Sequence, residues 1–331
     1  MTPETKKNRT TNWLLTAANI IKMYVGIAFI AVPHAVAQAG LVGSAVGFVY
    51  IVLINTFCVY ILLKARNRFK RQNIVDICDL AAVLYGEWLR PIMAVLLIST
   101  NGCFLMAYVM FLGTQSDQLM CKTFKAAECG NKHLYSMIIL TLLLPILYLK
   151  RLSAIGIFSL VVLVFTFVAI IIIIYLSIVI LQMSPQEADD TYGLHITDED
   201  RDYKIFDGLM LPIFCAAMMS LFEGNQQILN LYSEADKPQN FFLITLICIL
   251  ALTCFVAITV GYLGYLAFGN SVKGVILYSL PNDDPAAITA KICYVLTIMG
   301  SFVIVIQPIY YIIESSGWYR ATSTCCAEDA S

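Results

Sequence analysis

Two apolar segments of the chain are interrupted by residues that could bind a small solute. The first reads Tyr24-Val25-Gly26-Ile27-Ala28-Phe29, and the second reads Ser220-Leu221-Phe222-Glu223-Gly224-Asn225. A helix in lipid must satisfy its own backbone groups, so glycine and an ionisable residue inside such a helix predict backbone that faces a cavity. Paired interruptions of this kind bind substrate and ions near the middle of the membrane in secondary transporters. The two segments therefore predict a carrier.

Gly26 is the position of the first segment at which unwinding costs least. It has no side chain, so the backbone can open there and a ligand can approach closely. The freed amides and the positive end of the half-helix that follows could then bind a carboxylate. The alternative is that Gly26 and Ala28 are small residues that let helices pack closely, as is common in membranes. The second interruption favours the binding interpretation.

Glu223 is the only acidic residue well inside an apolar segment. A carboxyl group is costly in lipid and usually faces a cavity or a partner, and burial favours its protonated form. Glu223 is therefore a candidate proton carrier. An equally weighted alternative is a structural glutamate that hydrogen-bonds the backbone at the helix break.

Four further polar residues fall in or at the ends of apolar segments. Lys22 is expected to extend to the cytosolic interface, with pairing to an acidic group at an inner gate as the alternative. His34 is expected to be a solvated interfacial histidine rather than a pH sensor. Tyr108 could close a site with its hydroxyl, although aromatic packing is the commoner use. Ser301 is a candidate ion or substrate contact, and its position in the chain is the only reason for this expectation.

The composition of the chain identifies a multi-pass membrane protein. Of its 331 residues, 60% are hydrophobic and 13% are charged, and the mean hydropathy is +0.79. A soluble domain would need a larger charged surface. The net charge of −1 offers no electrostatic support for nucleic-acid binding.

Apolar runs long enough to cross a bilayer predict eight spans. Residues Met23 to Leu63 include no Asp, Glu, Lys or Arg, so this stretch holds parts of two spans, with Pro33, Gly40 and Gly43 marking the turn. The expected spans are Trp13–Val32, Leu41–Leu63, Pro91–Thr114, Tyr135–Leu149, Leu152–Leu181, Ile205–Leu231, Phe241–Phe268 and Ala287–Ile313.

The distribution of Lys and Arg predicts the orientation of a single transmembrane domain over residues 1–331. These residues are more frequent in segments on the side of the amino terminus, which places that terminus in the cytosol. Residues 1–12 and 315–331 are then cytosolic tails. Residues 182–204 form an acidic, solvated outer loop. Residues Asn73–Tyr85 have helical apolar spacing (Ile74, Ile77, Cys78, Ala81 and Leu84) and predict a short amphipathic helix at the cytosolic interface.

Other chemistry finds little support in the chain. Cys121 and Cys129 share a predicted outer loop and could form a disulfide if that loop faces an oxidising compartment. No Cys/His group has metal-ligand spacing, and no enzyme or nucleotide-binding motif is present. The chain is therefore not expected to be an enzyme or to hold a cofactor, and a proton or sodium gradient would drive any uphill transport.

A series of motifs between Asn19 and Glu314 resembles the amino acid/auxin permease family, which includes proton-coupled and vacuolar amino acid transporters. The order and spacing of the motifs together carry the resemblance. They are Asn19–Pro33 followed by Gln38-Ala39-Gly40, Asp79-Leu80-Ala81 with Tyr85-Gly86, Phe222-Glu223-Gly224 followed by Glu234 and Lys237–Phe241, Gly264–Gly269 with Leu280-Pro281, and Pro308 with Ile312–Glu314.

The resemblance implies an all-α LeuT-type fold, with five helices repeated in inverted topology and alternating access around helices one and six. It implies symport of amino acids across a lipid bilayer, usually with protons and sometimes with sodium. The resemblance implies substrate binding by Gly26 and its neighbours in helix one (Tyr24, Ile27, Ala28 and Phe29) and by Phe222, Glu223 and Gly224 in helix six. Tyr108 is a further substrate-binding candidate, and Glu223 and Ser301 are the ion-coupling candidates, on the basis of residue type and position.

The chain departs from the family pattern in helix one and at its carboxyl end. Ala28 replaces the usual second glycine, and Asn19 stands where some proton-coupled members have histidine. Eight helices are expected, whereas a LeuT-type core has about ten. The leading expectation is a proton-coupled amino acid carrier of the plasma membrane or of a vacuolar or lysosomal membrane. The alternative is a shortened, non-transporting homologue that senses amino acids or modulates a full-length paralogue.

Overall fold

The computed structural model describes residues 13–69, 74, 76–123, 130–147, 152–235 and 239–315. Within these ranges the fold is helical, as expected. The predicted tails lie outside the described residues, apart from Ser315 at the end of the last helix.

Helices lie at each of the eight predicted spans. Their bounds are α1 (Trp13–Tyr24) and α2 (Ile27–Ala39), α3 (Leu41–Arg68), α5 (Leu89–Gln118), α6 (Lys132–Leu147), α7 (Leu152–Gln182), α9 (Leu211–Met219) and α10 (Ile228–Glu234), α11 (Phe241–Phe255) and α12 (Leu263–Phe268), and α13 (Pro285–Ser315). Five helical stretches of the described chain are long and apolar enough to cross a membrane, and the bent pair α1–α2 makes a sixth. The fourth span is shorter than this, and the sixth is divided.

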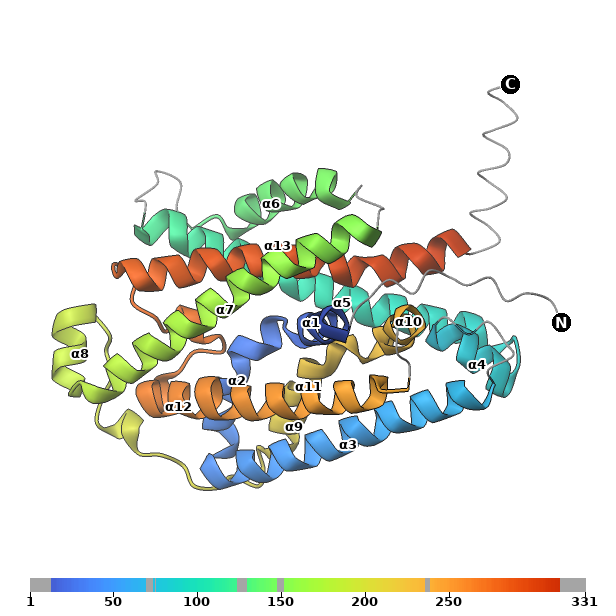
Figure 1. Ribbon diagram of the computed structural model, residues 1–331. Coiled ribbons are helices and arrows are strands. Elements are labelled where there is room, and N and C mark those ends of the chain that lie inside the picture. The colour runs from blue at the N-terminus through green and yellow to red at the C-terminus, as the bar shows by residue number, and fades with distance from the viewer. Residues whose placement is uncertain are drawn as a thin grey trace.

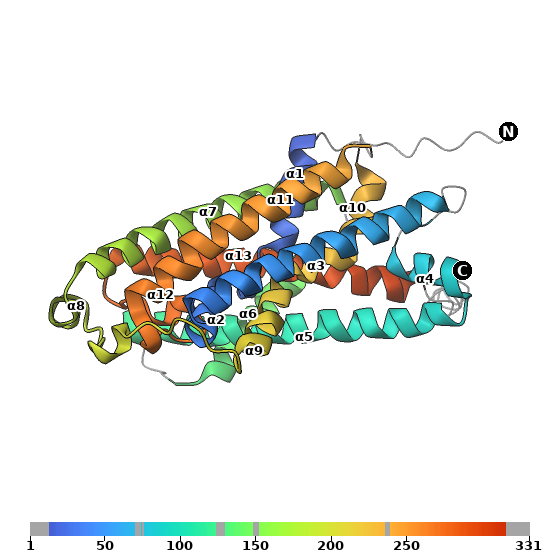
Figure 2. The same ribbon diagram turned by 90° about the horizontal axis from the view of Figure 1, so that it is seen from below.

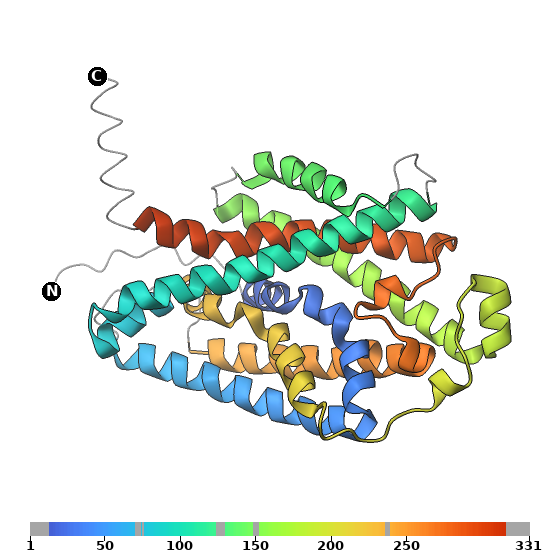
Figure 3. The same cartoon turned by 180° about the vertical axis from the view of Figure 1, so that it is seen from behind.

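The bundle places the two interrupted spans at its centre. Helices α5 and α13 lie on one side, with α6 outside them, and α3, α11 and α12 lie on the other (Figures 1 and 3). Helix α7 packs against both α13 and α12. The α1–α2 pair and the α9–α10 pair run between these two groups. A short helix, α4 (Ile77–Tyr85), lies near one end of the bundle, and another, α8 (Pro185–Tyr192), lies at the opposite end (Figure 2).

The first span is broken where the sequence predicts. Gly26 is extended (φ −130°, ψ −158°), and the axes on either side of the break differ by 51°. The turn to the next span is sharper than expected, because α2 continues through Pro33 and ends only at Gly40. Gly40 has φ 78°, which glycine adopts without steric cost. A Cβ atom there would also lie 2.8 Å from the Ile205 carbonyl oxygen.

The sixth span begins later than Ile205, so its predicted start is wrong. The amides of Leu41 and Val42 donate to the carbonyls of Lys204 and Ile205 at 3.0 and 2.8 Å. These carbonyls cap the start of α3, and the first helix of the sixth span begins only at Leu211. After α9, residues Ser220–Gln227 form a 3-10 helix, η3, in which Phe222 has non-helical angles (φ −104°, ψ 29°).

The acidic loop over residues 182–204 is exposed along most of its length, as expected of a solvated loop, and it is also ordered. Ser184 and Glu187 form a capping box at the start of α8. The guanidinium of Arg201 donates to the carbonyls of Ile180 and Met183, both at 3.1 Å, near the carboxyl end of α7. A cation satisfies the unpaired carbonyls at a helix end, so the loop is held against α7.

The short helix predicted over Asn73–Tyr85 forms as α4 but begins only at Ile77, so Ile74 lies before it. Cys78 and Ala81 of α4 are buried, as is Ile74, whereas Leu84 is exposed. Asp76 is the N-cap of α4 and accepts from the Asp79 amide at 2.7 Å. We expect Asp76→Ala to lower stability by about 1 kcal/mol, because the cap is lost. Thermal unfolding of the purified protein in detergent measures this.

Asp76→Asn is the matched control, since asparagine caps as well as aspartate. Burial raises the pKa of the Asp76 carboxyl, so the folded protein binds this proton more tightly than the unfolded chain. The contribution of Asp76 to stability therefore falls as the pH rises through its folded-state pKa. The stability of the asparagine variant should not show this pH dependence, because asparagine does not titrate. An Asp76→Ala variant as stable as wild type would contradict the capping role.

Candidate functional site

The breaks of the first and sixth spans face each other at close range. A Cβ atom at Gly26 would lie 2.7 Å from both the Glu223 Oε1 atom and the Tyr108 hydroxyl oxygen. A Cβ atom at Gly224 would lie 2.6 Å from the carbonyl oxygen of Met23. The two glycines thus let η3 approach the end of α1 more closely than any other residue type would allow. The close-packing and binding interpretations of Gly26 are not exclusive.

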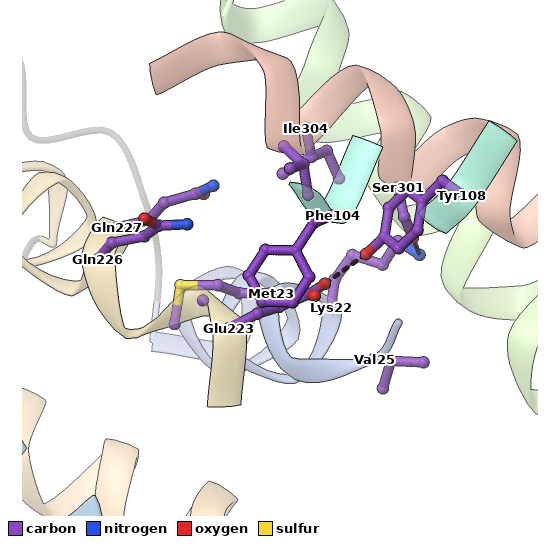
Figure 4. Close-up of a pocket in the computed structure, with 12 residues that line it drawn as sticks. Lys22, Met23, Val25, Phe104, Tyr108, Glu223, Gln226, Gln227, Ser301 and Ile304 are labelled. Carbon is purple, nitrogen blue, oxygen red and sulfur yellow. Dashed lines mark hydrogen bonds between the residues drawn. The ribbon is translucent and has the colours of Figure 1, made fainter. Parts of the chain in front are cut away.

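Glu223 is held by Tyr108 of α5. The Tyr108 hydroxyl donates to the Glu223 Oε1 atom, and Tyr108 is buried, with 1% of its surface exposed. Figure 4 shows this hydrogen bond beside the side chain of Lys22. A side-chain donor from another helix therefore holds the carboxyl group at the break.

Lys22 does not extend to the interface, so that expectation is wrong. Its side chain is 3% exposed, and its Nζ atom donates to the Ser301 Oγ atom of α13 at 2.8 Å. The Ser301 hydroxyl in turn donates to the Thr297 carbonyl at 3.1 Å. The side chain turns inward because Ser301 and Glu223 supply polar partners inside the bundle, which lipid cannot do.

A small pocket lies among these groups. It is lined by Lys22, Met23, Val25, Phe104, Tyr108, Glu223, Gly224, Gln226, Gln227, Ser301, Ile304 and Val305. Its free space accommodates about one water molecule. The bundle is therefore closed around this point in the described conformation.

The predicted site residues fall into two groups. Tyr108, Glu223, Gly224 and Ser301 line the pocket. The others surround it: Gly26 adjoins Glu223 and Tyr108, Ile27 and Ala28 form the half-buried first turn of α2, Phe29 is fully buried, and the rings of Tyr24 and Phe222 meet edge to face at 5.3 Å.

The carbonyl freed at the break of the first span is satisfied by a residue that we did not predict. The Tyr294 hydroxyl of α13 donates to the Gly26 carbonyl oxygen at 2.8 Å, and Tyr294 is fully buried. Its signal in the sequence was a tyrosine in the middle of an apolar span, where the hydroxyl must find a partner.

We expect Tyr294→Phe to destabilise the protein by roughly 1–3 kcal/mol, because a buried carbonyl loses its partner. Thermal unfolding in detergent measures the loss. Tyr310→Phe on the same helix is the control, since Tyr310 is exposed. Equal unfolding temperatures for the two variants would contradict the role of Tyr294.

Two pairs of amide side chains that join neighbouring spans were also missed. The Tyr24 hydroxyl donates to Asn225 at 2.8 Å, and Asn225 donates to Asn55 of α3. Asn101 of α5 and Gln226 exchange two amide hydrogen bonds, at 3.2 and 2.6 Å. Buried amides in apolar spans could have indicated these contacts, although not their partners.

Two further expectations concern His34 and Cys121. His34 is half-buried rather than solvated: its Nδ1 atom lies 3.1 Å from the Val272 carbonyl, and its Nε2 atom lies 3.1 Å from the Gln38 amide nitrogen. Cys121 is disulfide-bonded, but Cys129 lies outside the described residues, so their pairing stays a prediction. No group of three or more His, Cys, Asp or Glu residues in the described chain could hold a metal ion.

Comparison with known proteins identifies the family. Residues 9–330 match the family model described as transmembrane amino acid transporter protein. Vacuolar amino acid transporter 4 of Saccharomyces cerevisiae is 24% identical over 94% of this chain and 42% of its own length. Amino acid transporter ANT1 of Arabidopsis thaliana is 24% identical over 94% of this chain and 69% of its own length.

A second vacuolar relative is similar over nearly the same share of this chain and of its own length. Vacuolar amino acid transporter 3 of Schizosaccharomyces pombe is 23% identical over 91% of this chain and 43% of its own length. The chain thus spans about two fifths of the length of these fungal relatives.

The matched family has the LeuT-type fold, in which α1–α2 and α9–η3–α10 are helices one and six. The chain is a multi-pass membrane protein that belongs to the transmembrane amino acid transporter family, a family of carriers and not of enzymes.

Proposed function

We propose that the chain carries amino acids across a membrane by proton-coupled secondary transport, with alternating access around α1–α2 and α9–η3–α10. Membership of a transporter family supports this proposal. The observation that carries it is the meeting of the two breaks, where Gly26 adjoins the carboxyl group of Glu223. A site at paired breaks can bind a solute from either side as the half-helices move.

The substrate is an amino acid bound at the first turn of α2. The amides of Ile27 and Ala28 lie at the positive end of that helix, where a carboxylate is stabilised. Glu223 and Tyr108 lie beside Gly26 and offer acceptors for an ammonium group. The apolar side chains of Tyr24, Phe29 and Phe222, together with the backbone at Gly224, form the surroundings of the substrate.

The site must open before a substrate can enter, because the pocket has room for only about one water molecule. Gln226 and Gln227 of η3 line this pocket and lead into α10. Movement of α10 away from α1 would enlarge it. The described conformation is then a closed state of the transport cycle.

Glu223 is the proposed proton carrier, and Ser301 is the second ion-coupling residue. Glu223 is partly buried and faces the pocket, so one of its oxygens can gain and lose a proton during the cycle while the other accepts from Tyr108. A carboxyl group that moves between two sides in this way couples a proton gradient to the substrate.

The orientation is proposed with both ends of the chain in the cytosol. The helices α4 and α8 then lie at the cytosolic and outer ends, which matches their places at opposite ends of the bundle (Figure 1).

Vacuolar relatives favour an internal acidic membrane over the plasma membrane. An oxidising outer side would also allow the predicted Cys121–Cys129 disulfide.

Reconstitution in liposomes tests the proposal. The purified full chain is expected to accumulate radiolabelled amino acids when a pH gradient is imposed, and a protonophore should abolish the uptake. Exchange of labelled for unlabelled amino acid should persist without a gradient. The absence of flux and exchange with all common amino acids, under both pH and sodium gradients, would contradict transport by this chain.

The alternative function is that the chain senses amino acids or modulates a full-length paralogue instead of transporting them. Co-purification with such a paralogue, together with substrate binding but no flux from the chain alone, would favour that role. Transport by the purified chain would exclude it.

A further inference from the structure

Two amide side chains join α5 to η3 by reciprocal hydrogen bonds. The Asn101 amide nitrogen donates to the Gln226 Oε1 atom at 3.2 Å, and the Gln226 amide nitrogen donates to the Asn101 Oδ1 atom at 2.6 Å. Asn101 is fully buried, and its amide nitrogen also donates to the Leu97 carbonyl of its own helix at 2.9 Å. Each polar atom of the Asn101 side chain therefore has a partner, and the contacts with Gln226 tie two spans together.

The amide pair lies at the edge of the pocket that is nearer to α4. Gln226 lines the pocket, and Asn101 precedes the lining residue Phe104 by three positions along α5. Helix α5 starts beside α4, where the Arg90 guanidinium lies 3.2 Å from an Asp79 carboxyl oxygen, so Asn101 lies one turn closer to α4 than Phe104 does. Helix α10, which follows η3, runs on the same side of the bundle, away from α8 (Figures 1 and 2). A solute that moves from the pocket toward the α4 end would meet this pair.

Hydrogen bonds join η3 and α10 to both sides of the bundle. On the α3 side, the Tyr232 hydroxyl of α10 donates to the Asn67 Oδ1 atom at 2.8 Å, and the Arg66 guanidinium carbon lies 4.4 Å from the centre of the Tyr232 ring. On the α5 side, the amide pair forms the connection. Movement of α10 away from α1 and α5 would enlarge the pocket, and it must break the amide pair, whereas α3 can move together with α10.

We propose that Asn101 and Gln226 are a reversible lock that holds the pocket closed toward the α4 end of the bundle, and that their separation opens this end to the substrate. This inference rests on the proposed function and deepens it, because it assigns the residues that regulate access from one side. In the proposed orientation, the α4 end is the cytosolic end.

The energetics of an amide pair suit a contact that breaks in every cycle. Neither side chain is charged, so separation leaves no unpaired ion, and water that enters the open route replaces the lost hydrogen bonds. A buried ion pair would be far more costly to separate. Two net hydrogen bonds of ordinary strength shift an equilibrium between a closed and an open state by roughly 5- to 150-fold. The lock is therefore strong enough to favour the closed state and weak enough to open by thermal motion.

A thiol placed in the pocket reports the opening of this end without requiring transport. Val305 of α13 lines the pocket and is 8% exposed, so a charged, water-soluble maleimide reaches the thiol of Val305→Cys only when the pocket opens. Mass spectrometry of the purified full chain in detergent measures the labelling rate at position 305. Native Cys293 is the internal reference, because it is also buried and lies on the same helix about three turns closer to the α8 end (Figure 1).

Asn101→Ser removes the bonds to Gln226 and keeps the local bond, because a serine hydroxyl can donate to the carbonyl four positions earlier. In the Val305→Cys protein, we expect this substitution to raise the labelling rate at position 305 by roughly 10-fold and to leave the rate at Cys293 within about twofold. Gln226→Leu should have the same effect. The two substitutions together should act no more strongly than one alone, since they remove the same contact.

Thr100→Val is the matched control. Thr100 lies exposed on α5, and its hydroxyl donates to the Leu96 carbonyl of the same helix at 2.8 Å, so its loss breaks no contact between helices. Labelling at position 305 should stay as it is with the reporter alone. An unchanged rate in a folded Asn101→Ser or Gln226→Leu protein would overturn the inference, and either variant decides it if the other does not fold.

Two further outcomes would contradict the lock. Equal acceleration at position 305 and at Cys293 would indicate general loosening of the bundle rather than opening of one end. Additive effects of the two substitutions would show that Asn101 and Gln226 act separately. Absence of flux and exchange in liposomes would count against the proposed function, and labelling in detergent would still decide whether the amide pair closes the pocket.

Discussion

Glu223→Gln is expected to lower amino acid uptake driven by a pH gradient by roughly 100-fold or more, because glutamine cannot gain or lose a proton. Glutamine has nearly the same shape, and its carbonyl oxygen can still accept from the Tyr108 hydroxyl that now holds the carboxylate. The substitution therefore changes the chemistry of the site more than its packing. Uptake of labelled amino acid into liposomes measures the effect.

Exchange without a gradient separates proton coupling from substrate binding in this variant. A proton carrier predicts that Glu223→Gln retains exchange, because no net proton needs to move. Glu199→Gln is the matched control, since Glu199 lies exposed in the 3-10 turn between α8 and α9, and it should behave as wild type. Uptake by Glu223→Gln that keeps the wild-type dependence on the pH gradient would leave Glu223 with a structural role only.

Gly224→Ala is expected to destabilise the protein by roughly 1–3 kcal/mol through overpacking at the crossing of η3 and α1. The new Cβ atom would lie 2.6 Å from the Met23 carbonyl oxygen. A backbone carbonyl cannot rotate away as the end of a flexible side chain can, so the two segments must separate. Separation would also displace the neighbouring Glu223 and reduce transport. Thermal unfolding and liposome uptake measure the two effects.

Gly102→Ala is the control for this substitution. Gly102 lies within α5, and a Cβ atom there meets no heavy atom within 4 Å. Alanine favours the helix over glycine by about 1 kcal/mol, so this variant should be as stable as wild type or more so. Equal stability of the Gly224 and Gly102 variants would show that the close approach at Met23 is not required.

The helical membrane fold and the break of the first span could be predicted because they depend on local properties. Runs of apolar residues identify spans by length alone, and Gly26 together with the second interruption indicated where helix one could open. The same reasoning failed at Ile205, which is as apolar as its neighbours. Its carbonyl caps α3, and that contact joins residues far apart in the chain.

The contacts within the candidate site could not be predicted, because each joins helices that are distant in the sequence. Lys22 and Ser301 are separated by 279 positions, and Tyr294 and Gly26 by 268. Apolar periodicity does not specify which faces of two spans meet, since lipid and a neighbouring helix accept the same side chains. The expectation that Lys22 reaches the interface was reasonable for an isolated helix and wrong for this bundle.

Residue types alone thus establish that the chain crosses a membrane repeatedly and that Glu223 needs a polar partner, and they indicate Gly26 as the place where helix one can open. These follow from the cost of placing backbone and carboxyl groups in hydrocarbon, which is the same in any fold. Packing of the helices alone selects Tyr108 as that partner, directs Lys22 inward to Ser301, and closes the pocket around them. The partners of a buried polar group depend on which helices adjoin it, and the packing of the whole bundle determines that arrangement.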